Sequence, residues 1–309
     1  MDTQSKAAII VIAIVIPLSS LVVWNLDKPE IPYASANTNQ KIVAITSFYP
    51  LYEFTKNVGG DRVEVSLLIP FGIESHDWEP TVKDLQTMQQ ADLIVINGIG
   101  FENWVNDFDS INTDVIMVDT SKGINTNENN LVSHPTDPHI WLNPVMAKKQ
   151  VENISDALME IDPANKEYYS TNANSYILRL EQLDEKIKQE LSQCKKKDFI
   201  SFHSAFTYFA DQYGLIQHSI IESNDPHAEP TSKNLENMIN LAKNLDIDVI
   251  FTEEAIDTRT SEVIADEIGG TVLVLSPLEI GDKNTDYIEK MEQNLLHLKE
   301  GLCNWMQLK

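Results

Sequence analysis

Residues 163–195 read PANKEYYSTNANSYILRLEQLDEKIKQELSQCK, and they form the longest periodic segment of the chain. Apolar residues recur in this segment every three or four positions with charged residues between them, and no proline or glycine follows Pro163. This pattern predicts one amphipathic α-helix. At a rise of 1.5 Å per residue, a helix of about thirty residues spans roughly 45 Å, enough to join two domains as a stiff rod.

On both sides of this segment, short β-branched runs alternate with helical patterns. Before it, we expect strands at 41–47, 63–69, 93–97 and 115–118 and helices at 51–58, 80–90, 102–108 and 144–161. After it, we expect strands at 198–202, 215–221, 249–252 and 271–275 and helices at 206–213, 232–245, 261–268 and 286–305. Such alternation indicates βα units and parallel sheets. The predicted fold is therefore α/β, with two Rossmann-like lobes joined by one long rigid helix.

The length of 309 residues is too great for one ordinary domain and suits two. We predict an N-terminal segment at 1–40, a first lobe at 41–162, the linking helix at 163–197 and a second lobe at 198–309. Ligands of open α/β sheets bind outside the carboxyl ends of the strands, so two such lobes would form a binding cleft.

The charge balance is strongly acidic, with 23 basic against 47 acidic residues and a formal net charge of -24. Nucleic acid is therefore not an expected partner, because its phosphates favour surfaces rich in Lys and Arg. An acidic surface also raises the local concentration of cations.

Residues 7–24, AAIIVIAIVIPLSSLVVW, are uncharged and apolar. Their length lies between that of a signal-peptide core and that of a membrane-spanning helix. We expect a retained membrane anchor, with cleavage near Ala-Ser-Ala at 34–36 as the alternative, and a polar tether at 25–40. In either case the remainder of the chain is exported.

The sequence contains two cysteines, Cys194 and Cys303. They are free to pair in an exported protein, and the sequence leaves open whether they do. Neither belongs to a CxxC motif, which argues against a thiolate metal cage. No cysteine comes directly after residue 24, which argues against a thioether-linked lipid there.

Three histidines share one context: a loop or strand end, a neighbouring Asp or Ser, and a nearby aromatic residue. They are His76 in ESHDWEP (74–80), His139 in DPHIWLNP (137–144) and His203 in SFHSAF (201–206), with Trp78, Trp141 and Phe206 as candidate aromatic walls. A single histidine beside aromatic residues is more often a core residue, but three in one context predict a shared divalent metal. A ligating imidazole needs its other ring nitrogen oriented by a partner, and Asp77 and Asp137 are candidates for this role. The other histidines, His134, His218, His227 and His297, are expected to be structural or superficial.

Several motifs occur in the order and spacing of a known family. They are SFYP (47–50), GGD (59–61), HDWEP (76–80), NG (97–98) with FENW (101–104), DPHIWL (137–142), and His203 followed by YFA (208–210) and YGL (213–215). From about residue 41 onward, the chain resembles the metal-binding substrate-binding proteins of ABC transporters, the zinc and manganese receptors of cluster A-I or the periplasmic solute-binding family. The resemblance implies two α/β lobes joined by one long helix, with the metal in the cleft.

The resemblance also implies the metal ligands. The three family histidines fall on His76, His139 and His203, and manganese-type members carry Glu at the third position, so His203 favours zinc. Three imidazoles suit Zn2+, whereas Mn2+ prefers more oxygen ligands. The fourth ligand is commonly the Asp of a Leu-Asp-Pro-Leu pattern, but here that position is Ser276. We expect Glu279, three residues later, to be the fourth ligand and to leave first when the metal is released.

Two features qualify this ligand set. Glu253 and Glu254 follow the preceding predicted strand and are the alternative to Glu279. The loop at 121–136, which is rich in histidine in many zinc-type relatives, contains only His134 here. A metal-scavenging role of that loop is therefore not expected.

The function implied by the resemblance is an extracytoplasmic receptor, not an enzyme, that delivers Zn2+ to an ABC-type importer. Its partners would be the permease and its ATPase. The chain is expected to be a monomer, at the cell surface and membrane-anchored, or secreted if the N-terminal segment is cleaved.

Three alternatives to this function remain. The chain would be a manganese receptor of the same family, a metal-stabilised adhesin on the same scaffold, or a mononuclear zinc hydrolase. The absence of HExxH, nucleophile-elbow and phosphate-loop motifs argues against the hydrolase. The sequence does not separate the adhesin from the transport receptor.

Overall fold

The computed structural model describes residues 41–76, 78–109, 115–126, 137–222, 230–254 and 256–303. The chain divides into two units, residues 1–40 and residues 41–309, and the fold below is that of the second unit. The predicted anchor at 7–24 and tether at 25–40 lie outside the described residues, as do Asp77, His134 and His227. None of the helices within the described ranges is both long enough and apolar enough to span a membrane.

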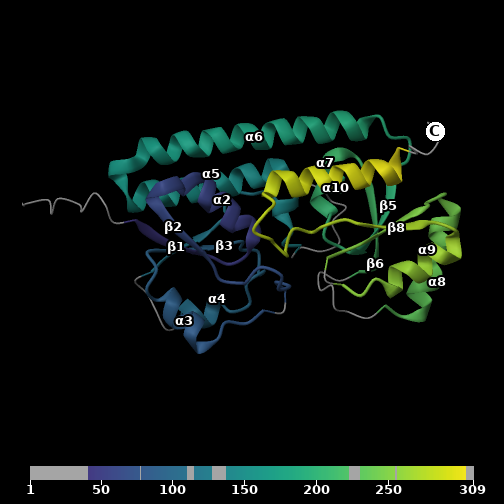
Figure 1. Ribbon diagram of the computed structural model, residues 1–309, viewed down its shortest axis with the longest axis horizontal. Helices are drawn as coiled ribbons and strands as arrows, with labels where there is room; N and C mark the ends of the chain where they lie inside the picture. Colours follow the sequence, from purple (N-terminus) through teal and green to yellow (C-terminus); the bar gives the residue numbers. More distant parts are fainter. Residues whose placement is uncertain are drawn as a thin grey trace, which may run out of the picture. The chain divides into compact units, whose positions relative to one another are not determined.

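The first sheet has four parallel strands in the order β2-β1-β3-β4. Figure 1 labels three of them, β1, β2 and β3. They are β1 (Ile42–Thr46), β2 (Val63–Leu67), β3 (Leu93–Ile96) and β4 (Ile116–Asp119). The register pairs Ile42 with Val63 and Ala44 with Leu93. The helices of this part are α2 (Tyr49–Gly59), α3 (Val82–Met88), α4 (Val105–Asp109) and α5 (Pro144–Ile161). Because β1 and β3 lie side by side, the chain leaves this pair in opposite directions, which opens a crevice at their carboxyl ends.

The second sheet repeats this topology, with four parallel strands in the order β6-β5-β7-β8. They are β5 (Asp198–His203), β6 (Ile216–Ile221), β7 (Val249–Thr252) and β8 (Thr271–Val274). The accompanying helices are α7 (Thr207–Tyr213), α8 (Ser232–Asn244), α9 (Arg259–Ile268) and α10 (Tyr287–Leu302). The predicted fold class is confirmed. The limits of the two lobes, 41–162 and 198–309, stay a prediction.

The long segment forms α6 (Lys166–Ser192), a helix of 27 residues. It begins three residues later than predicted, because the short 3-10 helix Pro163–Asn165 precedes it. Its buried residues recur at helical spacing: Tyr169, Ala173, Tyr176, Leu180, Leu183, Ile187 and Leu191. This face packs against α5 and α2 of the first half and against α10 of the second half. One continuous apolar cluster therefore runs through both halves.

The prediction that Pro80 occupies the first turn of a helix is wrong, because α3 begins only at Val82. Thr81 is the N-cap and forms a capping box with Asp84. The Asp84 backbone N–H donates to Thr81 Oγ1 at 3.3 Å, and the Thr81 N–H donates to Asp84 Oδ2 at 2.9 Å. Two orphan N–H groups are satisfied in this way, which fixes the start of the helix.

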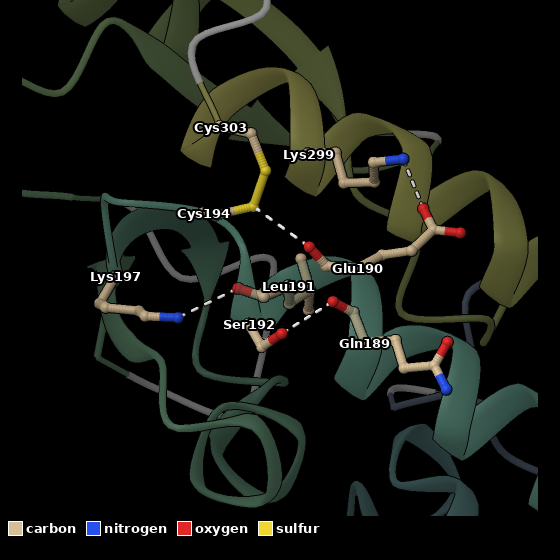
Figure 2. The surroundings of a disulfide bond; sticks show 8 residues. All are labelled: Gln189, Glu190, Leu191, Ser192, Cys194, Lys197, Lys299 and Cys303. Atoms are coloured by element: carbon tan, nitrogen blue, oxygen red, sulfur yellow. Dashed lines mark hydrogen bonds and ion pairs between the residues drawn. A yellow bond between two sulfur atoms is a disulfide. The ribbon is translucent and has the colours of Figure 1, made fainter.

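The two cysteines, which follow α6 and α10, form a disulfide (Figure 2). Ion pairs join the same two helices along their length: Arg179 with Asp286 at 2.8 Å, Lys186 with Glu292 at 2.7 Å, and Lys299 with Glu190. The disulfide closes a loop with a sequence separation of 109 residues. These contacts hold α10 in place on α6.

Replacing Cys303 with Ser should lower stability by about 2–4 kcal/mol, because a long covalent loop no longer restricts the unfolded chain. We expect the midpoint of thermal unfolding to fall by roughly 5–15 °C when it is measured without added oxidant or reductant. Under strong reductant the variant and the parent chain should unfold alike. An unchanged midpoint without reductant would contradict a stabilising role for the disulfide.

Candidate metal centre

The four residues predicted as ligands, His76, His139, His203 and Glu279, lie together in the structure. One ligand atom from each lies within 4.8 Å of the other three. His76 comes from the loop between β2 and α3, and His139 lies directly before the short 3-10 helix Ile140–Leu142. His203 ends β5, and Glu279 follows β8. The His76 side chain is 11% exposed, whereas the other three are 0–2% exposed.

The distances between these atoms suit a four-coordinate zinc ion. The Nε2 atom of His139 lies 3.3 Å from the Nε2 atoms of both His76 and His203. Glu279 Oε1 lies 3.2, 3.3 and 3.9 Å from the Nε2 atoms of His76, His139 and His203. Zinc bonds of about 2.0–2.1 Å in a tetrahedron place neighbouring ligand atoms about 3.3–3.4 Å apart. The cluster therefore needs little adjustment to surround such an ion.

His139 is oriented by a local carboxylate, as predicted. Asp137 Oδ1 accepts from the His139 backbone N–H at 3.0 Å and lies 2.7 Å from His139 Nδ1. The Tyr208 hydroxyl donates to the Asp137 backbone carbonyl at 2.9 Å. With Nδ1–H donating to the carboxylate, the lone pair of Nε2 is left facing the cluster.

His203 is oriented by a carboxylate that is distant in sequence. Both Glu253 carboxylate oxygens lie 2.7 Å from His203 Nδ1, and Oε1 also accepts from the His203 backbone N–H at 3.1 Å. Glu253 was an alternative ligand, but its carboxylate points at the rear of the His203 ring and not into the cluster. Glu254, the other alternative, pairs with Lys290 at 3.4 Å.

His76 has a different environment. Its backbone N–H donates to Glu74 Oε1 at 2.8 Å. Its ring lies edge to face with Phe101, with 5.1 Å between ring centroids. Asp77, the predicted orienting partner, lies outside the described residues.

Aromatic rings close the apolar side of the cluster. Trp141, which is fully buried, lies 5.1 Å from the His139 ring and 5.2 Å from Phe101. Of the other predicted walls, Phe206 belongs to the apolar core, and Trp78 is partly buried and packs against it. Phe101 occurs in the FENW motif, but nothing in that motif indicated its contact with His76.

A buried carboxylate supports the peptide that carries His139. Glu102 Oε1 accepts from Ser47 Oγ and from the Asn97 N–H, both at 2.7 Å, and Oε2 accepts from the Gly98 N–H at 3.1 Å. Burial raises the pKa of Glu102 to about 7, although these hydrogen bonds lower it. Asn97 Nδ2 in turn donates to the Pro138 carbonyl at 2.9 Å. The end of β3 is thereby tied to the residue before His139.

The charges of the cluster depend on one another. Burial lowers the pKa of His139, but Asp137 and Glu279 raise it by more than burial lowers it. The net effect is a pKa of about 9. Burial likewise lowers the pKa of His76, and the Glu279 carboxylate more than offsets this. Burial raises the pKa of Glu279, yet the three imidazoles hold it well below its usual range. The raised pKa values of His139 and His76 mean that a cation binding to these nitrogens competes with protons.

The remaining described histidines have other partners. His218 Nε2 lies 2.9 Å from Asp198 Oδ1, and His297 Nδ1 lies 2.5 Å from the Val274 carbonyl. Neither belongs to the metal cluster. The expectation that both are structural or superficial stays a prediction.

Known proteins resemble this chain over most of its length. Residues 44–301 match the family described as "Zinc-uptake complex component A periplasmic". The chain is 39% identical over 281 residues to the high-affinity zinc uptake system protein ZnuA of Bacillus subtilis (strain 168), covering 85% of this chain and 88% of that protein. It is 36% identical over 279 residues to the zinc-binding lipoprotein AdcA of Streptococcus pneumoniae (strain ATCC BAA-255 / R6), covering 84% of this chain but 56% of that longer protein.

Solved structures agree with this similarity. The metal-dependent lipoprotein YcdH from Bacillus subtilis is 40% identical with a TM-score of 0.76, covering 85% of this chain and 100% of that chain. The Zn(II)-bound ZnuA-like domain of Streptococcus pneumoniae AdcA is 36% identical with a TM-score of 0.75, covering 85% and 99%. The laminin-binding protein Lbp of Streptococcus pyogenes is 32% identical with a TM-score of 0.76, covering 85% and 99%.

Replacing Glu253 with Gln should weaken metal binding about 10–100-fold, because the His203 ring loses the carboxylate that orients it. Glu254→Gln is the matched control, since the neighbouring carboxylate pairs with Lys290 and not with a histidine. Competition titration against a chelator measures both affinities. Equal affinities of the two variants would contradict the orienting role of Glu253.

Proposed function

The chain belongs to the zinc-uptake complex component A family, and we propose from this that it is an extracytoplasmic receptor that binds Zn2+ and delivers it to an ABC-type importer. The observation that carries the proposal is the cluster of three imidazoles and one carboxylate within 4.8 Å of one another. The proposed ligands are His76, His139, His203 and Glu279. Zinc is the cargo of this protein.

The donor set favours zinc over manganese. Three nitrogen donors and one oxygen in a tetrahedral arrangement are typical of Zn2+, whereas Mn2+ favours octahedral sites rich in oxygen. The buried imidazoles cannot readily be exchanged for water, because the site is almost closed to solvent.

The same donor set distinguishes a receptor from a hydrolase. A catalytic zinc keeps a coordination position open for an activated water molecule. Four protein ligands leave no such position, and the similar proteins are named for zinc uptake and zinc binding. The chain is a transport receptor and not an enzyme.

The proposed partners are a membrane permease and its cytoplasmic ATPase, with the receptor acting as a monomer. The pneumococcal relative is named a lipoprotein. A thioether-linked lipid needs a free cysteine, and in this chain the two cysteines pair with each other. We therefore propose that the apolar residues 7–24 attach the protein to the membrane. Fractionation of expressing cells tests this attachment, and a chain recovered only in the medium would refute it.

Metal titration of residues 41–309 tests the proposed function. We expect one Zn2+ per chain and displacement of bound Mn2+ by Zn2+. A preference for Mn2+, or turnover of an ester or amide substrate by the zinc-loaded chain, would overturn the proposal. A strain lacking the protein should accumulate less zinc, which separates transport from adhesion. The relative Lmb of Streptococcus agalactiae is described as having both activities.

The individual ligands should differ in their effects. His139→Ala removes a nitrogen donor and the imidazole partner of the buried Asp137 carboxylate, so tight zinc binding should be lost. Glu279→Gln keeps an oxygen donor but removes its charge, so zinc affinity should fall less. Isothermal titration calorimetry measures both changes. Equal losses in the two variants would contradict this ranking.

Zinc affinity should fall as pH falls, because protons and zinc compete for the same nitrogen atoms. The pKa of His139 is raised to about 9 and that of His76 is also raised, so competition begins above the usual imidazole range. We expect affinity to increase from about pH 5 to about pH 9, with proton release on zinc binding at neutral pH. Calorimetry in buffers of different ionisation enthalpy measures this release. Affinity that is independent of pH would contradict the prediction.

A further inference from the structure

Glu279 lies on the segment 275–286 between β8 and α10, and hydrogen bonds hold this segment from both halves of the molecule. The Trp141 indole N–H donates to the Pro277 carbonyl at 2.8 Å, and the Tyr49 hydroxyl donates to the Thr285 carbonyl at 2.6 Å. These bonds hold the backbone on both sides of Glu279. The expectation that Glu279 leaves first on metal release stays a prediction. The residue is 3% exposed.

A side chain of α10 makes two hydrogen bonds to this segment. Asn294 Oδ1 accepts from the Ser276 backbone N–H at 2.8 Å, and Asn294 Nδ2 donates to the Ser276 carbonyl at 2.7 Å. Both polar atoms of one side chain thus bind both backbone groups of one residue. Asn294 is 2% exposed, so water does not readily replace either bond.

Ser276 transmits this attachment towards Glu279. Its Oγ accepts from the Leu278 backbone N–H at 3.1 Å. Leu278 is fully buried and has a φ of 59°, a left-handed conformation that is unfavourable for a branched residue. Such a conformation persists only where its surroundings impose it. It directs the next residue, Glu279, towards the three imidazoles.

The first half holds the other side of the segment. The Ser75 hydroxyl donates to the Glu279 carbonyl at 3.3 Å. A Cβ added at Gly281 would lie 2.2 Å from the Tyr49 ring, so the backbone approaches α2 as closely as glycine permits. The carboxylate of Glu279 therefore projects from a backbone that is held at several points.

Asn294 also stands on a fixed support. Its helix, α10, is joined to α6 by the disulfide and by ion pairs that include Lys186 with Glu292 at 2.7 Å. A side chain on a fixed helix is able to set the position of a loop, whereas one on a mobile element is not.

We propose that Asn294 is a positioning residue that sets where the Glu279 carboxylate meets the three imidazoles, and thereby favours four-coordinate Zn2+ over Mn2+. The proposal rests on the zinc-binding function proposed above. Mn2+ requires further oxygen ligands, so Glu279 would have to turn both oxygens to the ion or admit water. A fixed backbone presents one oxygen to the cluster and opposes both adjustments. When Asn294 is removed, the loop relaxes and manganese is accommodated more readily.

The test compares Asn294→Asp with Gln293→Glu in residues 41–309. Asn294→Asp keeps the shape of the side chain but replaces the donor to the Ser276 carbonyl with an acceptor. Gln293→Glu introduces the same charge one position earlier on the same helix, at an exposed residue. Asn294→Ala removes both hydrogen bonds without adding charge, and it provides a second variant if the buried Asp impairs folding.

Zinc and manganese affinities are measured by competition titration, and Co2+ absorption reports the coordination number. We expect both Asn294 variants to lose about 10–100-fold in zinc affinity, with manganese affinity unchanged or improved. Their Co2+ spectra should weaken towards those of higher coordination numbers. Gln293→Glu should match the parent chain in every measurement.

A double-mutant cycle with Glu279→Gln separates positioning from general destabilisation. If Asn294 acts through Glu279, its replacement should have little further effect on zinc affinity in the Glu279→Gln background. An undiminished effect in that background, or an unchanged ratio of zinc to manganese affinity in both Asn294 variants, would overturn the inference. Failure of the parent chain to bind zinc would instead overturn the proposed function.

Discussion

The candidate metal centre depends on one constraint. Four electron-rich atoms, three imidazole Nε2 atoms and one Glu279 oxygen, lie within a few ångströms of one another. Lone pairs gathered in a buried space repel one another unless protons or a cation lie between them. The raised pKa of His139 and the lowered pKa of Glu279 express this constraint. A divalent ion held by all four atoms would relieve this repulsion, and its binding would compete with protons.

The fold brings these four atoms together by placing the carboxyl ends of separate strands side by side. His203 ends β5, and Glu253, which orients it, follows β7 beside it in the second sheet. His139 and His76 come from the first half, and one continuous core beneath α6 joins the two halves. Each candidate ligand thus has its own supporting contacts. For Glu279 these include the two hydrogen bonds of Asn294 to the Ser276 backbone.

Local patterns predicted the parts of the site whose partners are close in sequence. Asp137 and His139 are two residues apart, so their contact could be inferred from Asp-Pro-His alone. The role of Glu253 could not, because it lies 50 residues from His203, and every carboxylate after a strand looks alike in one dimension. The start of α3 differs from the prediction although the signal that decides it is local. Pro80 is compatible with a first turn, but the capping box of Thr81 and Asp84 decided the boundary.

The order of residues in this chain was enough to predict two α/β halves with parallel sheets, a long connecting helix and three histidines as candidate ligands, because hydrophobic period and short motifs are local properties. Glu279 was expected as the fourth ligand from the family resemblance. Folding in three dimensions settled which carboxylate enters the cluster and which one stands behind a histidine. It also paired Cys194 with Cys303 and attached Asn294 to Ser276. Those outcomes depend on distances between segments far apart along the chain, and such distances are set by packing of the whole core.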